Sequence, residues 1–252
     1  ILKDGVYEFV KDKTTITVEN SKEIAGGPWM SNLGTAVSAV GVGKKTILNL
    51  NDNDLVINET ARAGSTGIAA INDAVVEINN PGDITINATG GGQTAAVYAN
   101  GSGEVHIHNG EKGILRVRAN TPNATNCAVI KTMNGKKGES KIIIDGMVDV
   151  LADYTTGSNE AISAVASRIE IGGGNIVAQN GAWAAIRAYG EFVSSNAGIV
   201  NINVTKDENG NANGAGNRKT TIIGDFVTNG GMGSKGYISG TLVQRSVRWT
   251  LR

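Results

Sequence analysis

The chain is poor in several residue types that compact proteins use freely. Its 252 residues include one cysteine, three prolines and only 4% aromatic residues. Cys127 can form no intramolecular disulfide, and its setting in NCAVI indicates a small buried hydrophobic residue and not a nucleophile. The low aromatic content removes the bulky rings that usually fill a globular core.

Net charge and long apolar runs are lacking as well. Lys plus Arg total 23 and Asp plus Glu total 23, so nothing draws the chain broadly to nucleic acid or anionic lipid, and we expect no nucleic-acid partner. No apolar run approaches the ~20 residues of a membrane helix. The first residues, ILKDGVYEF, do not form a secretory signal, so we expect any export signal outside this segment or already removed.

Turn-forming and aliphatic residues are abundant. Glycine contributes 35 residues and asparagine 27, while hydrophobic residues make up 40% of the chain. This mixture favours many short strands joined by turns, with enough aliphatic surface to bury a continuous core.

An internal repeat organises the chain. Six four-residue segments align without gaps at spacings of 31, 29, 32, 33 and 24 residues. Each is followed, after a turn, by a second short strand and then a third, too close together for a helix of ten or more residues. The segments are AVSA 36–39, GIAA 67–70, AVYA 96–99, AVIK 128–131, AISA 161–164 and AIRA 185–188.

The alternation within these strands predicts which side chains point inward. In the first strand one aliphatic register should stack from repeat to repeat, and in the second strand two should do so. The first-strand register is Val37, Ile68, Val97, Val129, Ile162 and Ile186. The second-strand registers are Leu48, Val76, Val105, Ile142, Ile169 and Val200, then Leu50, Ile78, Ile107, Ile144, Ile171 and Ile202. Alanines form a further first-strand register, to which Lys131 is the one exception.

These patterns predict an all-β fold, a right-handed parallel β-helix. It would be a three-sided solenoid of six to eight coils, a rod of roughly 30 to 40 Å at the ~4.8 Å spacing of neighbouring strands. We expect residues 1–33 to form an irregular N-terminal partial coil and residues 34–252 to form the repeats of a truncated fragment. The Gly- and Asn-rich stretch 206–219 should project as a mobile excursion.

The segments GTAVSAV, TGIAAI, QTAAVYA, NEAISAV and WAAIRAYG, each followed by strands ending in IN or IxIxN, resemble the passenger domains of bacterial autotransporters, the pertactin-like and AIDA-like surface adhesins. The resemblance spans about residues 33–240 and is a match of repeat pattern. It implies a secreted rod on the bacterial cell surface, tethered to the outer membrane by a C-terminal β-barrel outside this segment. It also implies a host glycan or protein, or a neighbouring bacterial surface, as partner, with self-association between rods open.

Catalytic and metal-binding patterns are weak by comparison. Outward positions of the second strand read Asn49, Glu77, His106, Ile143, Glu170 and Asn201, without the adjacent acids of a polysaccharide-cleaving enzyme. His106 and His108 could share zinc only if an acid such as Glu77 or Glu104 joined them, and an exposed pair is the simpler interpretation. Asparagines at one register (Asn51, Asn79, Asn203) and at another (Asn58, Asn87) predict amide ladders. We therefore expect no catalytic residues, no metal and no cofactor.

A non-enzymatic adhesin or interaction rod is accordingly the function that we expect. Its binding patch should lie around Trp183, Arg187 and Tyr189, with Tyr98 on the same strand face of an earlier coil, because exposed aromatic residues and Arg favour sugar or protein contact. Two alternatives stay open. One is a carbohydrate-active β-helix enzyme, either a lyase or hydrolase or a tailspike-like depolymerase, and the other is a structural stalk that binds nothing.

Overall fold

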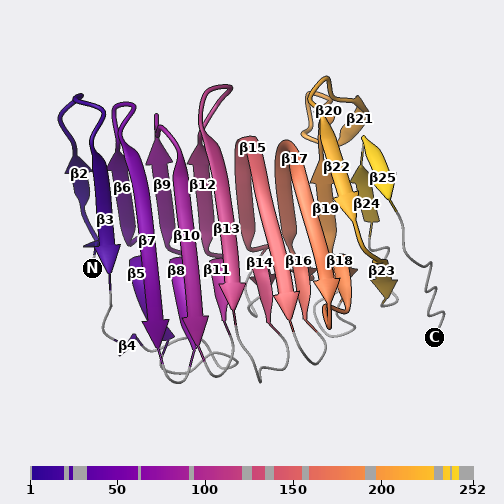
Figure 1. Ribbon diagram of the computed structural model, residues 1–252, viewed down its shortest axis with the longest axis horizontal. Coiled ribbons are helices and arrows are strands. Elements are labelled where there is room, and N and C mark those ends of the chain that lie inside the picture. Colours follow the sequence, from indigo (N-terminus) through magenta and orange to yellow (C-terminus); the bar gives the residue numbers. More distant parts are fainter. Residues whose placement is uncertain are drawn as a thin grey trace.

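The protein is a right-handed parallel β-helix. The computed structural model describes residues 2–19, 23–24, 33–61, 64–90, 94–120, 127–133, 139–154, 159–190, 197–229, 235–238 and 240–243. The chain winds through three strand positions per coil, and successive coils lie side by side from the β1–β3 end to the β23–β25 end (Figure 1). No described segment is a helix that is long and apolar enough to cross a membrane.

Three ladders of parallel strands form the sides of the solenoid. The first ladder is β1 (Leu2–Lys3), β5 (Leu33–Val40), β8 (Ser65–Ile71), β11 (Ala95–Asn100), β14 (Ala128–Met133), β16 (Glu160–Val165), β18 (Ala184–Tyr189) and β23 (Phe226–Asn229). The second is β2 (Val6–Glu8), β6 (Lys45–Asn49), β9 (Val75–Asn79), β12 (Glu104–His108), the first parts of β15 (Lys141–Tyr154) and β17 (Arg168–Asn180), β19 (Ile199–Ile202) and β24 (Lys235–Ile238). The third is β3 (Thr15–Glu19), β7 (Asp54–Ala61), β10 (Ile84–Gly90), β13 (Ile114–Asn120), the second parts of β15 and β17, β22 (Thr220–Ile223) and β25 (Thr241–Val243).

Two coils depart from the three-strand pattern. In β15 and β17 the second and third strands run on as one, with a register irregularity between Ile144 and Met147. These two strands join the second and third ladders into one sheet. At the N-terminal end β1, β2 and β3 extend all three ladders, and β4 (Glu23–Ile24) pairs antiparallel with β5.

The core consists of stacked aliphatic columns, as the alternation predicts. The prediction of the first-strand column is confirmed except at Val129, because the member of the column in β14 is Ile130. The residues that pair in register are Val37, Ile68, Val97, Ile130, Ile162 and Ile186. The one-residue correction moves Lys131 out of the alanine register, where Thr132 stands instead. Each isoleucine or valine so buried contributes roughly 1.5–3 kcal/mol.

The second-strand registers are confirmed from β9 onward and are wrong by two residues in β6. Thr46 pairs with Val76, and Leu48 pairs with Ile78. Ile47, and not Asn49, is therefore the outward neighbour of Glu77, and Asn49 pairs with Asn79. The amide ladder consequently joins Asn79 to Asn49, at 2.8 Å, and does not include Asn51. The predicted ladder between Asn87 and Asn58 is present at 3.0 Å.

The stretch 206–219 is not a featureless excursion. Strands β20 (Val204–Lys206) and β21 (Ala212–Ala215) form an antiparallel hairpin between β19 and β22. The Asp207 carboxylate closes its turn by accepting the backbone N–H groups of Asn209 (2.9 Å) and Asn211 (2.8 Å). The hairpin is thus an addition to one coil that has its own secondary structure, and the predicted mobility of the stretch stays a prediction.

Candidate functional site

An arginine between two aromatic rings lies on the outward side of the first ladder, near its C-terminal end. The guanidinium carbon of Arg187 is 5.3 Å from the centroid of the Trp183 ring and 4.9 Å from that of Tyr189. Arg187 and Tyr189 stand two residues apart on β18 and so project to the same side. Trp183 precedes the strand, held by its backbone N–H, which donates to the Asn159 carbonyl at 2.7 Å. We call Trp183, Arg187 and Tyr189 the aromatic–arginine cluster.

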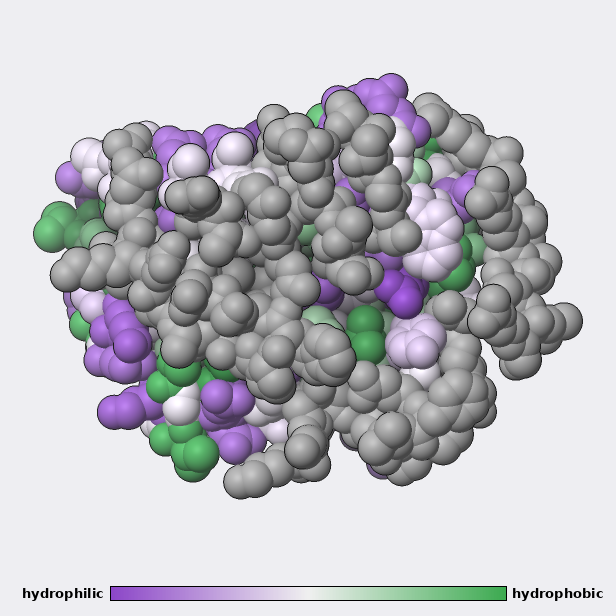
Figure 2. Space-filling view, turned by 90° about the horizontal axis from the view of Figure 1, so that it is seen from below, coloured by the Kyte–Doolittle hydropathy of each residue, from purple (hydrophilic) through white to green (hydrophobic). Residues whose placement is uncertain are grey.

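All three side chains of the cluster are partly exposed, and the Arg187 side chain keeps 20% of its surface in contact with solvent. A guanidinium over an aromatic face is stabilised by about 0.5–1 kcal/mol at exposed sites and by about 2 kcal/mol when desolvated. Two such faces hold Arg187 in one orientation. In the view from below, the described residues that are visible include both hydrophilic and hydrophobic ones (Figure 2).

A buried carboxylate anchors the other end of this guanidinium. Arg187 Nη1 is 3.1 Å from Glu160 Oε1, and the Glu160 side chain is 1% exposed. Burial raises the pKa of Glu160 to about 7, although the nearby cations Arg187 and Lys131 act in the opposite direction. Burial likewise lowers the pKa of Lys131, and the charge of Glu160 opposes that shift. The exposed cluster is therefore joined to a buried charged group, the most expensive kind of group to bury.

Two polar atoms beside this ion pair have no hydrogen-bond partner in the described structure: Arg187 Nε and Ser163 Oγ. Ser163 on β16 lies in register between Lys131 on β14 and Arg187 on β18. An unsatisfied buried donor or acceptor costs roughly 1–3 kcal/mol. The arrangement thus leaves two buried polar atoms with unused hydrogen-bonding capacity.

Tyr98 does not belong to this surface. It occupies the same outward column, in the order Tyr98, Lys131, Ser163, Arg187, which places it about three strand spacings, or ~14 Å, from Arg187. Its side chain is 0% exposed, packs with Ala69, Ile71 and Ala95, and points its hydroxyl at Met133 Sδ, 3.8 Å away. Burial raises the pKa of Tyr98. The expectation that Tyr98 is an exposed contact residue is therefore wrong.

The two histidines have separate acidic partners. His106 Nε2 is 3.0 Å from Glu104 Oε2, whereas His108 Nδ1 is 2.7 Å from Asp145 Oδ2. Their ring centroids are 6.0 Å apart in an edge-to-face arrangement. Within the described ranges no group of three or more His, Cys, Asp or Glu side chains gathers closely enough to hold a metal ion.

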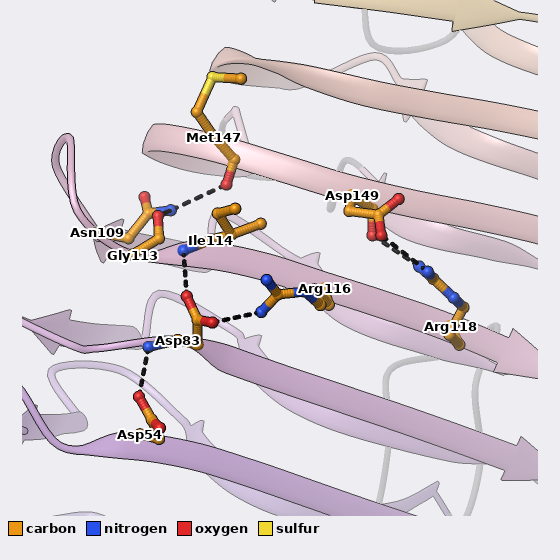
Figure 3. A network of polar contacts seen from close by, with 9 residues as sticks. All are labelled: Asp54, Asp83, Asn109, Gly113, Ile114, Arg116, Arg118, Met147 and Asp149. Carbon is orange, nitrogen blue, oxygen red and sulfur yellow. Dashed lines mark hydrogen bonds and ion pairs between the residues drawn. The ribbon is translucent and has the colours of Figure 1, made fainter. Parts of the chain in front are cut away.

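Several outward acids tie neighbouring coils together (Figure 3). Asp54 Oδ1 accepts the backbone N–H of Asp83 at 2.7 Å, and Asp83 Oδ1 accepts that of Ile114 at 3.0 Å. Asp83 Oδ2 also pairs with Arg116 at 2.6 Å. Each carboxylate thus bridges its own coil to the next one, and this role is structural.

The aspartates at 145, 149 and 153, spaced by four in the sequence, also have separate partners. Asp145 contacts His108, Asp149 pairs with Arg118 at 2.9 Å, and Asp153 accepts from Asn180 (2.5 Å) and Gln179 (3.0 Å). The three carboxylates therefore face different partners and do not converge.

Comparison of the chain with family models, curated proteins and solved structures finds no significant match. The site must therefore be interpreted from its own geometry. Sequence reasoning had singled out Trp183, Arg187 and Tyr189, which the structure brings together, but it missed Glu160 and Lys131. A signal for Glu160 existed: it is the one acid in an outward column otherwise made of Thr and Ala, namely Thr35, Thr66, Ala95, Ala128 and Ala184.

Proposed function

We propose that this chain is a non-enzymatic adhesive segment of a bacterial surface rod, with the aromatic–arginine cluster as its contact point for a host glycan or protein. The observation that carries the proposal is the Arg187 guanidinium held between the Trp183 and Tyr189 rings at 5.3 and 4.9 Å. Aromatic faces and a pre-oriented arginine are the residues that dominate binding surfaces, because little side-chain freedom remains to be lost on binding.

The repeat architecture and the resemblance to autotransporter passenger domains support this proposal. A solenoid presents an extended outer surface to partners, and its stability is close to a sum of contacts between neighbouring coils. Surface side chains can therefore change without loss of the scaffold. The cell-surface location and the tether to the outer membrane belong to the same proposal.

Binding of the purified chain to glycan arrays and to host matrix proteins tests this function. We expect Trp183→Ala and Tyr189→Ala each to weaken binding by roughly 10-fold or more, as a side chain worth 1–2 kcal/mol implies. Both variants leave the Arg187–Glu160 ion pair in place, so the fold should persist. Arg118→Ala, which removes a surface arginine paired with Asp149 on another ladder, is the matched control and should bind normally.

Equal binding by the wild type, Trp183→Ala and Tyr189→Ala would show that the cluster is not the contact point. Failure of the wild type to bind any surface molecule would favour the stalk alternative.

One observation favours a second candidate, an enzyme that cleaves acidic polysaccharides. A buried Glu160 whose pKa is raised to about 7 stands beside two cations, Arg187 and Lys131, and a carboxyl group with such a pKa can act as a proton donor at neutral pH. Incubation with polysaccharide panels, monitored for new reducing ends and for the ultraviolet absorbance of unsaturated products, distinguishes this candidate. Turnover that is lost in Glu160→Gln would replace the adhesin proposal.

A further inference from the structure

The β20–β21 hairpin leaves a hollow against the second ladder, away from the aromatic–arginine cluster. The hollow has a volume of about 190 Å³ and lies between strands β15, β17 and β19 and the first strand of the hairpin. Two contacts hold the base of the hairpin: Asn203 Nδ2 donates to the Arg218 carbonyl at 2.6 Å, and Arg218 N donates to Asn203 Oδ1 at 3.0 Å. The cavity is thus framed by ordered elements on both sides.

A break in the stacking of side chains lies at the edge of this hollow. Ile143, Glu170 and Asn201 stand in register on its floor. Asp145 lies two residues after Ile143 on β15, and Gly172 lies two residues after Glu170 on β17, in the next coil. A Cβ atom at Gly172 would lie 2.1 Å from the Asp145 carbonyl oxygen. Because Gly172 has no side chain, the column is interrupted in the coil that precedes the one with the hairpin, and the Arg218 guanidinium lies beside Gly172 and donates to the Asp145 carbonyl.

The polar groups that line the hollow are only partly satisfied. Asn201 is 2% exposed, and its Oδ1 has no hydrogen-bond partner in the described structure. Asp145 uses one carboxylate oxygen on His108 and keeps 43% of its side-chain surface exposed. The Lys206 ammonium has three donors and contacts Glu170. The site therefore offers acceptors and donors within a small space.

Charge and size limit what could bind there. The carboxylates of Asp145, Glu170 and Glu139 are balanced by the cations Lys206, Arg168 and Arg218. Arg168 contacts Glu170 at 3.4 Å and Glu139 at 3.5 Å, and Arg218 donates to the Asp145 carbonyl, so the hollow selects neither an anion nor a cation. Its volume lies below the range of about 300–1,000 Å³ typical of drug-sized ligands, so it admits a single small ring. Ile143 and Val204 supply aliphatic surface for the C–H face of such a ring.

We propose that this hollow is a binding site for one neutral sugar residue, such as a hexose at the end of a glycan chain. Sugar hydroxyl groups both donate and accept, which matches the Asn201 amide, the Asp145 carboxylate and the Lys206 ammonium. The site is independent of the aromatic–arginine cluster, and neither needs the other.

Methyl glycosides of neutral hexoses are the probes, with glucuronate and glucosamine as charged comparisons. Their binding to the full chain can be followed by carbon–proton NMR of the Ile and Val methyl groups. We expect shifts at Ile143 and Val204 with a dissociation constant of about 1 mM, on the order of what a few hydrogen bonds provide. Both charged sugars should bind at least about 10-fold more weakly.

Two variants separate loss of binding from loss of fold. Asn201→Ala removes an amide whose oxygen has no partner and leaves none orphaned, so it should fold and bind at least about 10-fold more weakly. Val204→Trp places a ring in the hollow from the hairpin side and should abolish binding. Trp183→Ala should bind these sugars like the wild type, which distinguishes this site from the proposed adhesive one.

Absence of shifts at Ile143 and Val204 would overturn the proposal. So would unchanged affinity in folded Asn201→Ala and Val204→Trp, or a preference for glucuronate or glucosamine.

Discussion

At the scale of single residues, the asparagine content reflects the corners of the solenoid. Eleven described residues other than glycine have a positive φ, and eight of them are Asn or Asp, including Asn51, Asn72, Asn80 and Asn203. Short amide and carboxylate side chains tolerate this left-handed conformation better than other side chains do. Turn geometry therefore accounts for part of the Asn content, and the two amide pairs on the outer faces account for a further part.

Glu160 is the residue whose protonation should be visible in stability. Its pKa rises from a reference of 4.5 to about 7 on folding, so between these values the folded protein holds a proton that the unfolded chain releases. Unfolding then becomes more favourable as the pH rises from 4.5 to 7, and the effect is complete above 7. We expect the free energy of unfolding of the wild type to fall by about 1–3 kcal/mol relative to Glu160→Gln across this window.

Urea denaturation of both proteins at several pH values measures this difference, and the common contribution of all other groups cancels. Parallel stability curves from pH 4.5 to 8 would show that Glu160 titrates normally in the folded protein.

At the scale of strands and turns, the close approach of successive coils limits side-chain size. At Gly113, which precedes β13, a Cβ atom would lie 2.1 Å from the Gly82 carbonyl of the preceding coil. Nearby Asn109 stabilises the same turn, because its Nδ2 donates to the carbonyls of Gly113 (3.0 Å) and Met147 (3.1 Å; Figure 3). Its Oδ1 accepts the Gly146 N–H at 2.7 Å. Adjacent turns therefore stack almost as tightly as the strands.

Two glycines in one turn separate the effects of crowding and backbone strain. Gly113→Ala should destabilise the protein by about 3 kcal/mol, because the clashing atom belongs to the backbone and cannot move aside. Gly110→Ala, where φ is +54° and no atom lies within 4 Å, should cost only about 1 kcal/mol. Chemical denaturation midpoints of the two variants give the comparison. A larger loss in Gly110→Ala would mean that close packing of coils does not limit this turn.

The three ladders were predictable because period-two alternation of aliphatic residues recurs in every coil. The errors also have a physical origin. In the first ladder two consecutive residues, such as Val129 and Ile130, belong to the core, so alternation alone could not decide which one continues the column from Val97. In β6, Thr46 occupies the position that Val76 takes in β9, and a polar residue gave no aliphatic signal.

The candidate site was only partly predictable for a related reason. Trp183, Arg187 and Tyr189 are close in sequence, so their proximity in space follows from one strand and the residue that precedes it. Glu160 and Lys131 come from two other coils and reach Arg187 only through the register of β14, β16 and β18, which the misplacement of Val129 had shifted. Tyr98 was correctly placed in the outward column, but outward direction did not guarantee exposure.

At the scale of the whole molecule, each coil contacts only the coils on either side, so a coil should be removable. Deletion of residues 68–96 joins Gly67 to Val97. Val97 then takes the place of Ile68, with which it pairs in register in the full chain. We expect this shortened chain to fold with a β-type circular dichroism spectrum and one cooperative thermal transition, since the neighbouring ladders remain in phase.

Deletion of residues 68–97 is the control. It removes one residue more and places Tyr98, a residue of the outward column, at the inward position of Ile68. This variant should unfold at a clearly lower temperature, because a one-residue slip reverses the direction of the side chains. Equal stability of the two deletions would contradict the view that aliphatic columns define the register.

The fused strands β15 and β17 have a mechanical consequence. A force that pulls the two ends of the solenoid apart acts directly on the hydrogen bonds between neighbouring coils. These hydrogen bonds then break one after another along each strand. Strands β15 and β17 are paired from Lys141 and Arg168 at one end to Tyr154 and Asn180 at the other. This is the longest pairing between any two described strands. Under a steadily rising force the rod should therefore yield first toward its ends and hold longest at this seam.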